Sequence, residues 1–207
     1  LMQIPHSFLQ KTGTGSNISL PHPGEYGAGM IFLSPDPVER RKSEEQFERI
    51  VREEGQKLLG WRTIPTDDST LGNTAKSCMP FIRQVFIARS QDIKDDLSFE
   101  RKLYVIRKRA ENIIRYTDTN ADDFFYVASL SCRTIVYKGM LTAEQVGEFY
   151  KDLSDPEMQS ALALVHSRYS TNTFPSWERA HPNRYIMHNG EINTLRGNIN
   201  WMHARQS

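Results

Sequence analysis

The chain has 207 residues, 38% of them hydrophobic and 25% charged, which is ordinary for a sizeable soluble globular domain. Lysine and arginine number 26 against 25 acidic residues, and the net charge of +1 excludes a global field that would attract nucleic acid or an anionic membrane. No apolar run approaches the roughly 20 residues of a membrane span, and the N-terminal stretch lacks a signal-peptide pattern. The sequence therefore predicts a cytoplasmic protein with a local function and neither nucleic acid nor membrane as a partner.

The first residues, 1–9, form an apolar segment that looks like the inside of a fold. A long loop is expected at 11–29, because this stretch is rich in Gly, Pro and Ser, and its GTGS sequence lacks the Gly-Lys-Ser/Thr of a phosphate-binding loop. A short buried strand is predicted at 29–34. The pattern Ser43-x-x-Gln46 then resembles a capping box and predicts the start of a helix. The apolar face expected for this helix consists of Phe47, Ile50, Val51 and Leu58.

The middle of the chain is predicted to contain most of the sheet. Strands are expected at 58–65 and 80–89, followed by a polar loop at 92–96. In the next segment Leu103 and Val105 alternate as in a strand, so we expect a strand there and a helix at 107–116. Two β-rich runs around a Ser-Cys-Arg turn at 131–133 predict a hairpin.

The last third is predicted to mix helices and strands. Thr142-x-x-Gln145 predicts a capped helix that reaches about Tyr150, and Asp155-Pro156 predicts another short one. Strands are expected at 161–169 and 184–190, and Asn193 is expected to cap a closing helix through Trp201. Antiparallel strands with helices interspersed indicate a single α+β domain.

The two cysteines, Cys78 and Cys132, are far apart in the sequence and form no CxxC motif. Free cysteine is among the most often buried residue types, so we expect two reduced, partly buried thiols. No histidine lies at metal-ligand spacing from either cysteine, and the sequence predicts no metal site.

Asn189 and Gly190 form a pair with two interpretations. An Asn-Gly dipeptide at the end of a strand is a common turn signal. Alternatively, the Asn189 side-chain amide and the backbone N–H of Gly190 both donate to one developing oxyanion, because no Cβ at Gly190 blocks the approach. The residues alone leave the turn and the oxyanion hole open.

Arg168 directly follows a predicted buried strand, where an unpaired guanidinium would be costly. Its carboxylate partner belongs either to the protein, in a structural salt bridge, or to a ligand. The hydroxyls around Arg168 either tie down a loop or hydrogen-bond a polar substrate. Together with an oxyanion hole, they suit an amino acid whose side-chain carbonyl is attacked. These hydroxyls belong to Ser167, Ser170, Thr171 and Thr173.

His166 and His188 each end a predicted apolar strand. We expect both to be hydrogen-bonded within the protein rather than to bind metal or act as a base, because no carboxylate lies at ligand spacing. Ser167 with either histidine would give a nucleophile and a base, but the G-x-S-x-G elbow is absent. The polar stretch therefore predicts a binding pocket without a convincing nucleophile.

The stretch HSRYSTNTFPSWERAHPNRYIMHNGEINTLRGN, residues 166–198, resembles the glutaminase domain of glutamate synthase large (alpha) subunits. The segments GWRTIPTD, RQVFIAR, FERKLYVIRKRAEN and RTIVYKGML extend the resemblance over nearly the whole chain. Type 2 glutamine amidotransferases in general share mainly the H-x-R and H-N-G elements, whereas 173–182 and the earlier segments resemble glutamate synthase alone. Residues 1–207 are therefore identified as part of a single type 2 glutamine amidotransferase domain.

The resemblance implies the N-terminal-nucleophile (Ntn) hydrolase fold, a four-layer αββα sandwich with antiparallel sheets, here incomplete at both ends. In the chemistry it implies, the thiolate of an N-terminal cysteine attacks L-glutamine and releases glutamate and ammonia for the reductive amination of 2-oxoglutarate. No cofactor is expected in these residues, while FMN and an iron–sulfur cluster are implied for the parent enzyme. The implied partners are L-glutamine, the rest of the large subunit and a small flavoprotein subunit.

The resemblance also assigns roles to residues. Arg168 resembles the arginine that holds the α-carboxylate of glutamine, and Asn189 with Gly190 resembles the oxyanion hole. Tyr169 and Thr171 lie in the loop that closes on substrate. The sequence departs from the pattern because its first residue is leucine rather than cysteine, and because the acidic residue that binds the substrate amino group would lie beyond the last residue. We therefore expect an internal fragment that is inactive alone.

Two other classes of function stay open. One is a non-catalytic module that binds an amino acid. The other is a different hydrolase that uses Ser167 or Cys132 as its nucleophile.

Overall fold

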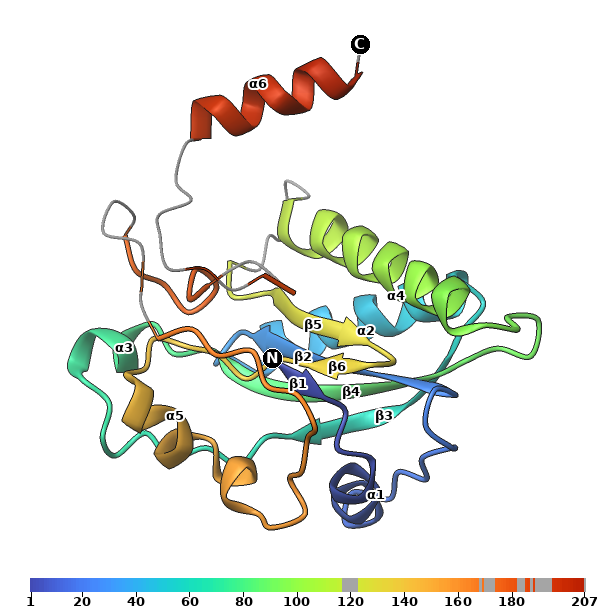
Figure 1. Ribbon diagram of the computed structural model, residues 1–207, viewed down its shortest axis with the longest axis horizontal. Helices are drawn as coiled ribbons and strands as arrows, with labels where there is room; N and C mark the ends of the chain where they lie inside the picture. The colour runs from blue at the N-terminus through green and yellow to red at the C-terminus, as the bar shows by residue number, and fades with distance from the viewer. Residues whose placement is uncertain are drawn as a thin grey trace.

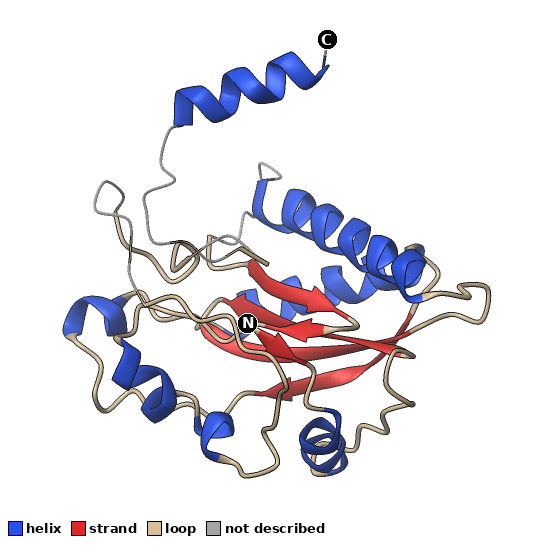
Figure 2. Ribbon diagram, in the orientation of Figure 1, coloured by secondary structure: helices blue, strands red, loops and turns tan. Residues whose placement is uncertain are grey.

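The computed structural model describes residues 1–116, 123–167, 169, 174–181, 185–186, 188 and 195–206. Two antiparallel sheets are surrounded by helices (Figures 1 and 2). The larger sheet has the order β3-β4-β2-β5 and contains β2 (Tyr26–Leu33), β3 (Lys57–Thr63), β4 (Phe81–Ala88) and β5 (Tyr126–Ser131). The smaller sheet pairs β1 (Met2–Gln3) with β6 (Thr134–Ile135).

The helices differ widely in length. They are α1 (His6–Thr14), α2 (Pro37–Glu53), α3 (Asn73–Ser77), α4 (Asp96–Ala110), the π-helix η1 (Glu111–Arg115), α5 (Ala143–Phe149), the 3₁₀ helix η2 (Lys151–Ser154) and α6 (Leu195–Gln206). Among the described residues, no helix combines the length and the apolar character needed to cross a bilayer. Helices mixed with antiparallel sheets confirm the predicted α+β class.

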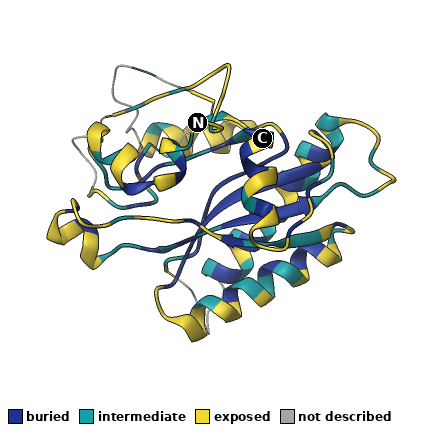
Figure 3. Ribbon diagram, turned by 90° about the horizontal axis from the view of Figure 1, so that it is seen from below, coloured by how far each residue is buried: buried dark blue, intermediate teal, exposed yellow. Residues whose placement is uncertain are grey.

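The alternation of side chains along β2 divides the core into two layers. All eight residues of β2 are buried. Ile31 and Leu33 pack with the apolar stripes of α2 and α4 on one face. Met30 and Phe32 belong to the opposite layer, which also contains Trp177, and α1 packs against the same side of β2 farther along the strand. Figure 3 shows the buried strands between helices whose outer surfaces are exposed.

The start of α2 was predicted too late. The helix begins at Pro37, and Ser43 lies buried inside it. The cap is Asp36, whose carboxylate accepts the backbone N–H groups of Val38 and Glu39 at 2.8 and 3.0 Å. A proline at the first helical position is pre-organised for the helix, so the true start combines two local signals, and a Ser-x-x-Gln pattern also occurs within helices.

The predicted strands at 29–34, 58–65 and 80–89 are confirmed as β2, β3 and β4, with shifted ends. Leu58 belongs to β3 and not to the apolar face of α2, because α2 ends at Glu53. The stretch predicted as an apolar segment followed by a loop instead contains α1, whose Phe8 and Leu9 are buried.

The edge strand β3 carries a bulge. Its register against β4 shifts between Leu58 and Gly60. Gly60 has a φ of 155°, a conformation that L side chains rarely adopt. A Cβ at this position would lie 2.8 Å from Cγ1 of Ile18, so the glycine also lets the loop after α1 pack on the strand.

The predicted strand at Leu103 and Val105 is wrong, because α4 is helical throughout. Its N-cap Asp95 accepts the backbone N–H of Ser98 at 2.9 Å. Val105 is 39% exposed, whereas Leu103 is fully buried, and this difference fits helical and not alternating geometry. The buried side of the helix consists of Phe99, Leu103, Ile106 and Ala110.

The predicted hairpin at 131–133 is also wrong. The chain does turn there, but β6 pairs with β1, and β5 pairs with β2. The Ser131 hydroxyl accepts the backbone N–H groups of Arg133 and Thr134 at 3.0 and 3.1 Å. It donates to Glu100 at 2.7 Å. These bonds fix a turn that leads the chain from one sheet into the other.

The capping box at the start of α5 is confirmed. Gln145 N–H donates to the Thr142 hydroxyl at 3.4 Å, and Thr142 N–H donates to the Gln145 side chain at 3.0 Å. The helix predicted from Asp155 is wrong, because η2 ends at Ser154 and a turn follows. The closing helix is α6, which continues past Trp201. Its predicted cap, Asn193, lies outside the described residues.

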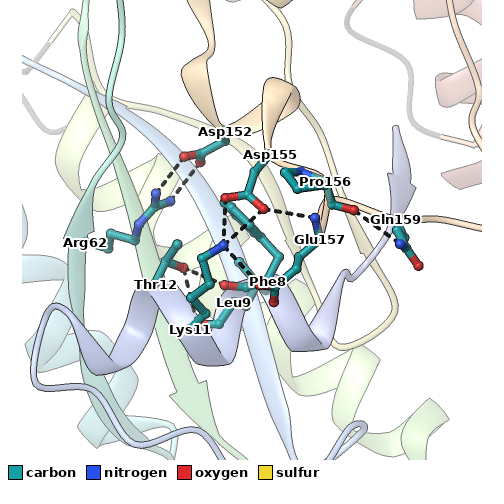
Figure 4. Close-up of polar contacts among 10 residues, drawn as sticks. All are labelled: Phe8, Leu9, Lys11, Thr12, Arg62, Asp152, Asp155, Pro156, Glu157 and Gln159. Atoms are coloured by element: carbon teal, nitrogen blue, oxygen red, sulfur yellow. Dashed lines mark hydrogen bonds and ion pairs between the residues drawn. The ribbon is translucent and has the colours of Figure 1, made fainter.

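A buried ion pair links β3 to η2. The Arg62 guanidinium donates to both carboxylate oxygens of Asp152, at 2.6 and 2.8 Å, and the two residues are 7% and 3% exposed (Figure 4). Asp152 also accepts the hydroxyl of Tyr137 at 3.1 Å. Two charges in a low-dielectric interior are tolerated only when they are paired and hydrogen-bonded, as they are here.

Asp152→Asn should destabilise the protein strongly, because it leaves the Arg62 charge buried without its counter-charge. The expected loss is about 3–5 kcal/mol in the free energy of unfolding, measured by chemical denaturation. Asp155→Asn is the control: Asp155 pairs with Lys11 at 2.9 Å at the surface, where water screens the charges, and it should cost far less. Equal losses from both substitutions would show that burial does not matter here.

Candidate functional site

A cavity of about 140 Å³ lies beside the small sheet. Residues from three parts of the chain line it, together with Leu1: 136–139, 141 and 146 in the first, 164–167 and 169 in the second, and 180–181 with 185–186 in the third. The last two stretches belong to the polar region that the sequence singled out. The first was not predicted to take part.

The stretch that carries His166 runs beside β1. Leu164 N–H donates to the Leu1 carbonyl at 2.8 Å, and the Leu1 amine donates to the Leu164 carbonyl at 3.0 Å. The strand predicted at 161–169 is wrong for its described residues, because only Ala163 forms a bridge, to Met2. His166 and Ser167, which follow this short pairing, line the cavity.

Trp177 fixes the second polar stretch to the core. The indole is 4% exposed, and its N–H donates to the Ala75 carbonyl at 3.0 Å. It packs edge-on against Phe32 of β2. A Cβ at Gly139 would lie 2.7 Å from Cε3 of the indole, so only a glycine lets the cavity wall and Trp177 meet this closely.

Lys138 brings a buried cation to the cavity wall. The side-chain ammonium donates to the Tyr126 hydroxyl at 3.0 Å and to the Glu178 carbonyl at 2.6 Å. The Lys138 carbonyl accepts the hydroxyl of Tyr150 at 2.7 Å. Both ends of this residue are therefore held, and its positive charge favours anionic groups nearby.

Tyr169, predicted to lie in the loop that closes on substrate, lines the cavity. Its hydroxyl donates to the Gly139 carbonyl at 2.8 Å. Burial, with a smaller contribution from Cys78, raises the pKa of this phenol, so it stays protonated and acts as a donor at neutral pH. In this structure the hydroxyl is used to join the two walls of the cavity.

The other four predicted site residues, Arg168, Thr171, Asn189 and Gly190, lie outside the described residues. Most of the strand predicted at 184–190 is outside them as well, and Tyr185, Ile186 and His188 are not in a strand. The described neighbours of the four nevertheless meet. The ring centroids of His166 and His188, the first residues of the H-x-R and H-N-G motifs, are 5.1 Å apart.

Both cysteines are free thiols, as predicted. Burial and the carboxylate of Glu100 raise the pKa of Cys132 to about 12, so its sulfur is protonated and weakly nucleophilic at neutral pH. Cys132 does not line the cavity of His166. The Cys78 thiol donates to the Thr74 carbonyl at 3.2 Å. The hydrolase hypothesis with Cys132 as nucleophile therefore loses its support.

The sequence matches the class-II glutamine amidotransferases over residues 1–207. It is 59% identical over 206 residues to the large chain of NADPH glutamate synthase from Bacillus subtilis. This alignment covers 100% of this chain and 13% of the Bacillus protein. It is 44% identical to NADH glutamate synthase of Schizosaccharomyces pombe and 41% identical to a ferredoxin-dependent glutamate synthase of Pyropia yezoensis, each over 98% of this chain. The chain spans only 10 to 13% of the length of these relatives.

Gly139→Ala should displace Trp177 and destabilise the cavity. The added methyl group overpacks a tight contact, and we expect a loss of about 1–3 kcal/mol in the free energy of unfolding, measured by denaturant titration. Gly147→Ala in α5 is the matched control, because a Cβ there meets nothing within 4 Å. This control should be neutral or slightly stabilising, since alanine favours helices. A harmless Gly139→Ala would mean that the indole does not need this glycine.

Proposed function

This chain belongs to the class-II glutamine amidotransferases, and from this premise we propose that it forms the glutamine-binding part of a glutamate synthase. The relatives named above are all glutamate synthases, and the family match covers every residue. The observation that carries the proposal is the approach of His188 to His166, which lines the cavity. The motifs that contain these two histidines also contain the predicted substrate and oxyanion residues.

In the proposed reaction, a cysteine thiolate adds to the side-chain carbonyl carbon of L-glutamine. The oxygen gains negative charge in the tetrahedral intermediate, and we assign the Asn189 amide and the Gly190 N–H as its donors. Ammonia leaves, and water then hydrolyses the thioester to glutamate. Arg168 is assigned to the α-carboxylate of the substrate, with Tyr169 and Thr171 in the loop over it.

The nucleophile is assigned to another part of the longer protein. Cys132 is buried and protonated, and the Cys78 thiol is engaged with a backbone carbonyl. FMN and an iron–sulfur cluster are likewise proposed for the longer protein. Such clusters are usually held by four cysteine thiolates, and two cysteines in 207 residues cannot supply them. Neither group is therefore assigned to this chain.

A non-catalytic amino-acid-binding module is the competing hypothesis. It predicts glutamine binding without ammonia release in the full-length protein. The two hypotheses also assign different roles to Asn189. In a binding module its side chain contacts only the uncharged amide of bound glutamine, whereas in an amidotransferase it stabilises the oxyanion.

Asn189→Ala in the full-length protein should lower kcat for glutamine hydrolysis about 10²–10³-fold with little change in KM, because the amide stabilises charge that exists only in the transition state. Steady-state ammonia release measures both parameters. Asn198→Ala on the exposed side of α6 is the control and should leave both unchanged. An unaltered kcat in Asn189→Ala would reduce the Asn-Gly pair to a turn.

Arg168→Lys should raise KM for glutamine, because lysine keeps the charge but cannot make the two parallel bonds of a guanidinium to a carboxylate. Glutamate formation from free ammonia should survive, since that route does not use the glutamine pocket. The control is Arg179→Lys, an exposed arginine of the neighbouring stretch. If Arg168 instead forms a structural salt bridge, its substitution will lower the melting temperature and both activities together.

A further inference from the structure

Three histidines meet at the cavity. His166, His181 and His188 each offer one ring nitrogen, and these three nitrogens lie within 4.8 Å of one another. The ring centroids are 4.0, 5.1 and 5.6 Å apart. All three residues are half-buried, and His166 and His181 line the cavity. The motifs drew attention to His166 and His188 only, because His181 comes from the segment between them.

The hydrogen bonds around the cluster leave ring nitrogens in the state that binds metals. His181 Nε2 lies 2.7 Å from the carbonyl oxygen of Ile186. A carbonyl only accepts, so Nε2 carries the proton and Nδ1 presents a lone pair. This is the arrangement in which a backbone carbonyl orients a metal-binding imidazole.

His166 contributes a second ring nitrogen, Nδ1, that is not hydrogen-bonded to any described residue. This nitrogen is buried, and its lack of a described partner is contrary to our expectation of an internally bonded histidine.

The distances require a modest movement. Zinc–nitrogen bonds of about 2.0–2.1 Å place the nitrogens of a tetrahedral site about 3.4 Å apart. The nitrogens are within 4.8 Å now, so a shift of about an ångström closes the site. The rings of His166 and His181 are stacked at 14°, and because lone pairs lie in the ring plane, one ring must tilt.

The backbone already holds this loop in an uncommon conformation. His181 and Tyr185 have φ values of 43° and 60°, in the left-handed region. A tyrosine there costs free energy that the surrounding structure must offset. The Tyr185 hydroxyl is bonded to Thr134 at 3.0 Å, which ties Tyr185 to β6.

We propose that His166, His181 and His188 bind one first-row divalent metal ion, with Zn²⁺ as the best-suited example. Three imidazoles are a known ligand set for zinc, and the fourth position of a tetrahedron remains for water or another ligand. Two of the three ligands, His166 and His181, line the cavity. The site goes beyond the proposed glutaminase chemistry, in which the nucleophile is a thiolate and no metal takes part.

The test is equilibrium dialysis of the full-length protein against Zn²⁺, after chelator treatment, with zinc counted by elemental mass spectrometry. His166→Ala, His181→Ala and His188→Ala should each bind close to one zinc fewer than the wild type at a free zinc concentration several times the wild-type Kd. Each should raise the Kd of this site by more than the about 10–100-fold that loss of an outer partner costs. The control is His22→Ala, an exposed histidine outside the cluster, which should bind as the wild type does.

Folding and binding are separated by a second measurement. Zinc should raise the melting temperature of the wild type and of His22→Ala but not of the three cluster variants. A cluster variant that no longer unfolds cooperatively without zinc is replaced by its glutamine counterpart. Zinc uptake that is equal in the wild type and all three variants overturns the proposal, and so does an equal loss in His22→Ala. The readout is independent of glutaminase activity, so the proposed function stands or falls separately.

Discussion

The buried pair of Arg62 and Asp152 is the constraint that joins the fold to the cavity. Arg62 belongs to the large sheet, and Asp152 belongs to a short 3₁₀ helix that lies beside it. Because neither charge tolerates isolation in the interior, their mutual position is fixed. Tyr137, which lines the cavity, donates to the same carboxylate. The ion pair therefore links the cavity wall to the large sheet.

Local signals made part of the fold predictable. The strands β2, β3 and β4 are buried runs bounded by turn residues, and the Thr142 capping box marks the start of α5. The wrong predictions arose where a short sequence pattern is compatible with both a helix and a strand, or where the partner strand is distant in the sequence. Leu103 and Val105 alternate over too few residues to exclude a helix, and nothing near β6 indicates that it pairs with β1 instead of continuing a hairpin.

The candidate site was predictable in one half only. A dense run of hydroxyls, an arginine and an Asn-Gly pair pointed to residues 166–198, and the resemblance sharpened their roles. The opposite wall depends on contacts across long stretches of chain. Gly139 matters because Trp177 packs on it, and Lys138 matters because the Glu178 carbonyl and the Tyr126 hydroxyl hold its ammonium. No spacing within the segment VYKGML reveals either role.

The bulge at Gly60 affects how copies of the protein meet in a concentrated solution. β3 is an edge of the larger sheet, and a straight edge strand offers a row of N–H and C=O groups on which a strand of another molecule can grow. The register shift between Leu58 and Gly60 interrupts that row, and the loop residue Ile18 lies against the interruption. Gly60, which lets the loop containing Ile18 pack on β3, therefore also disfavours edge-to-edge aggregation of the sheet.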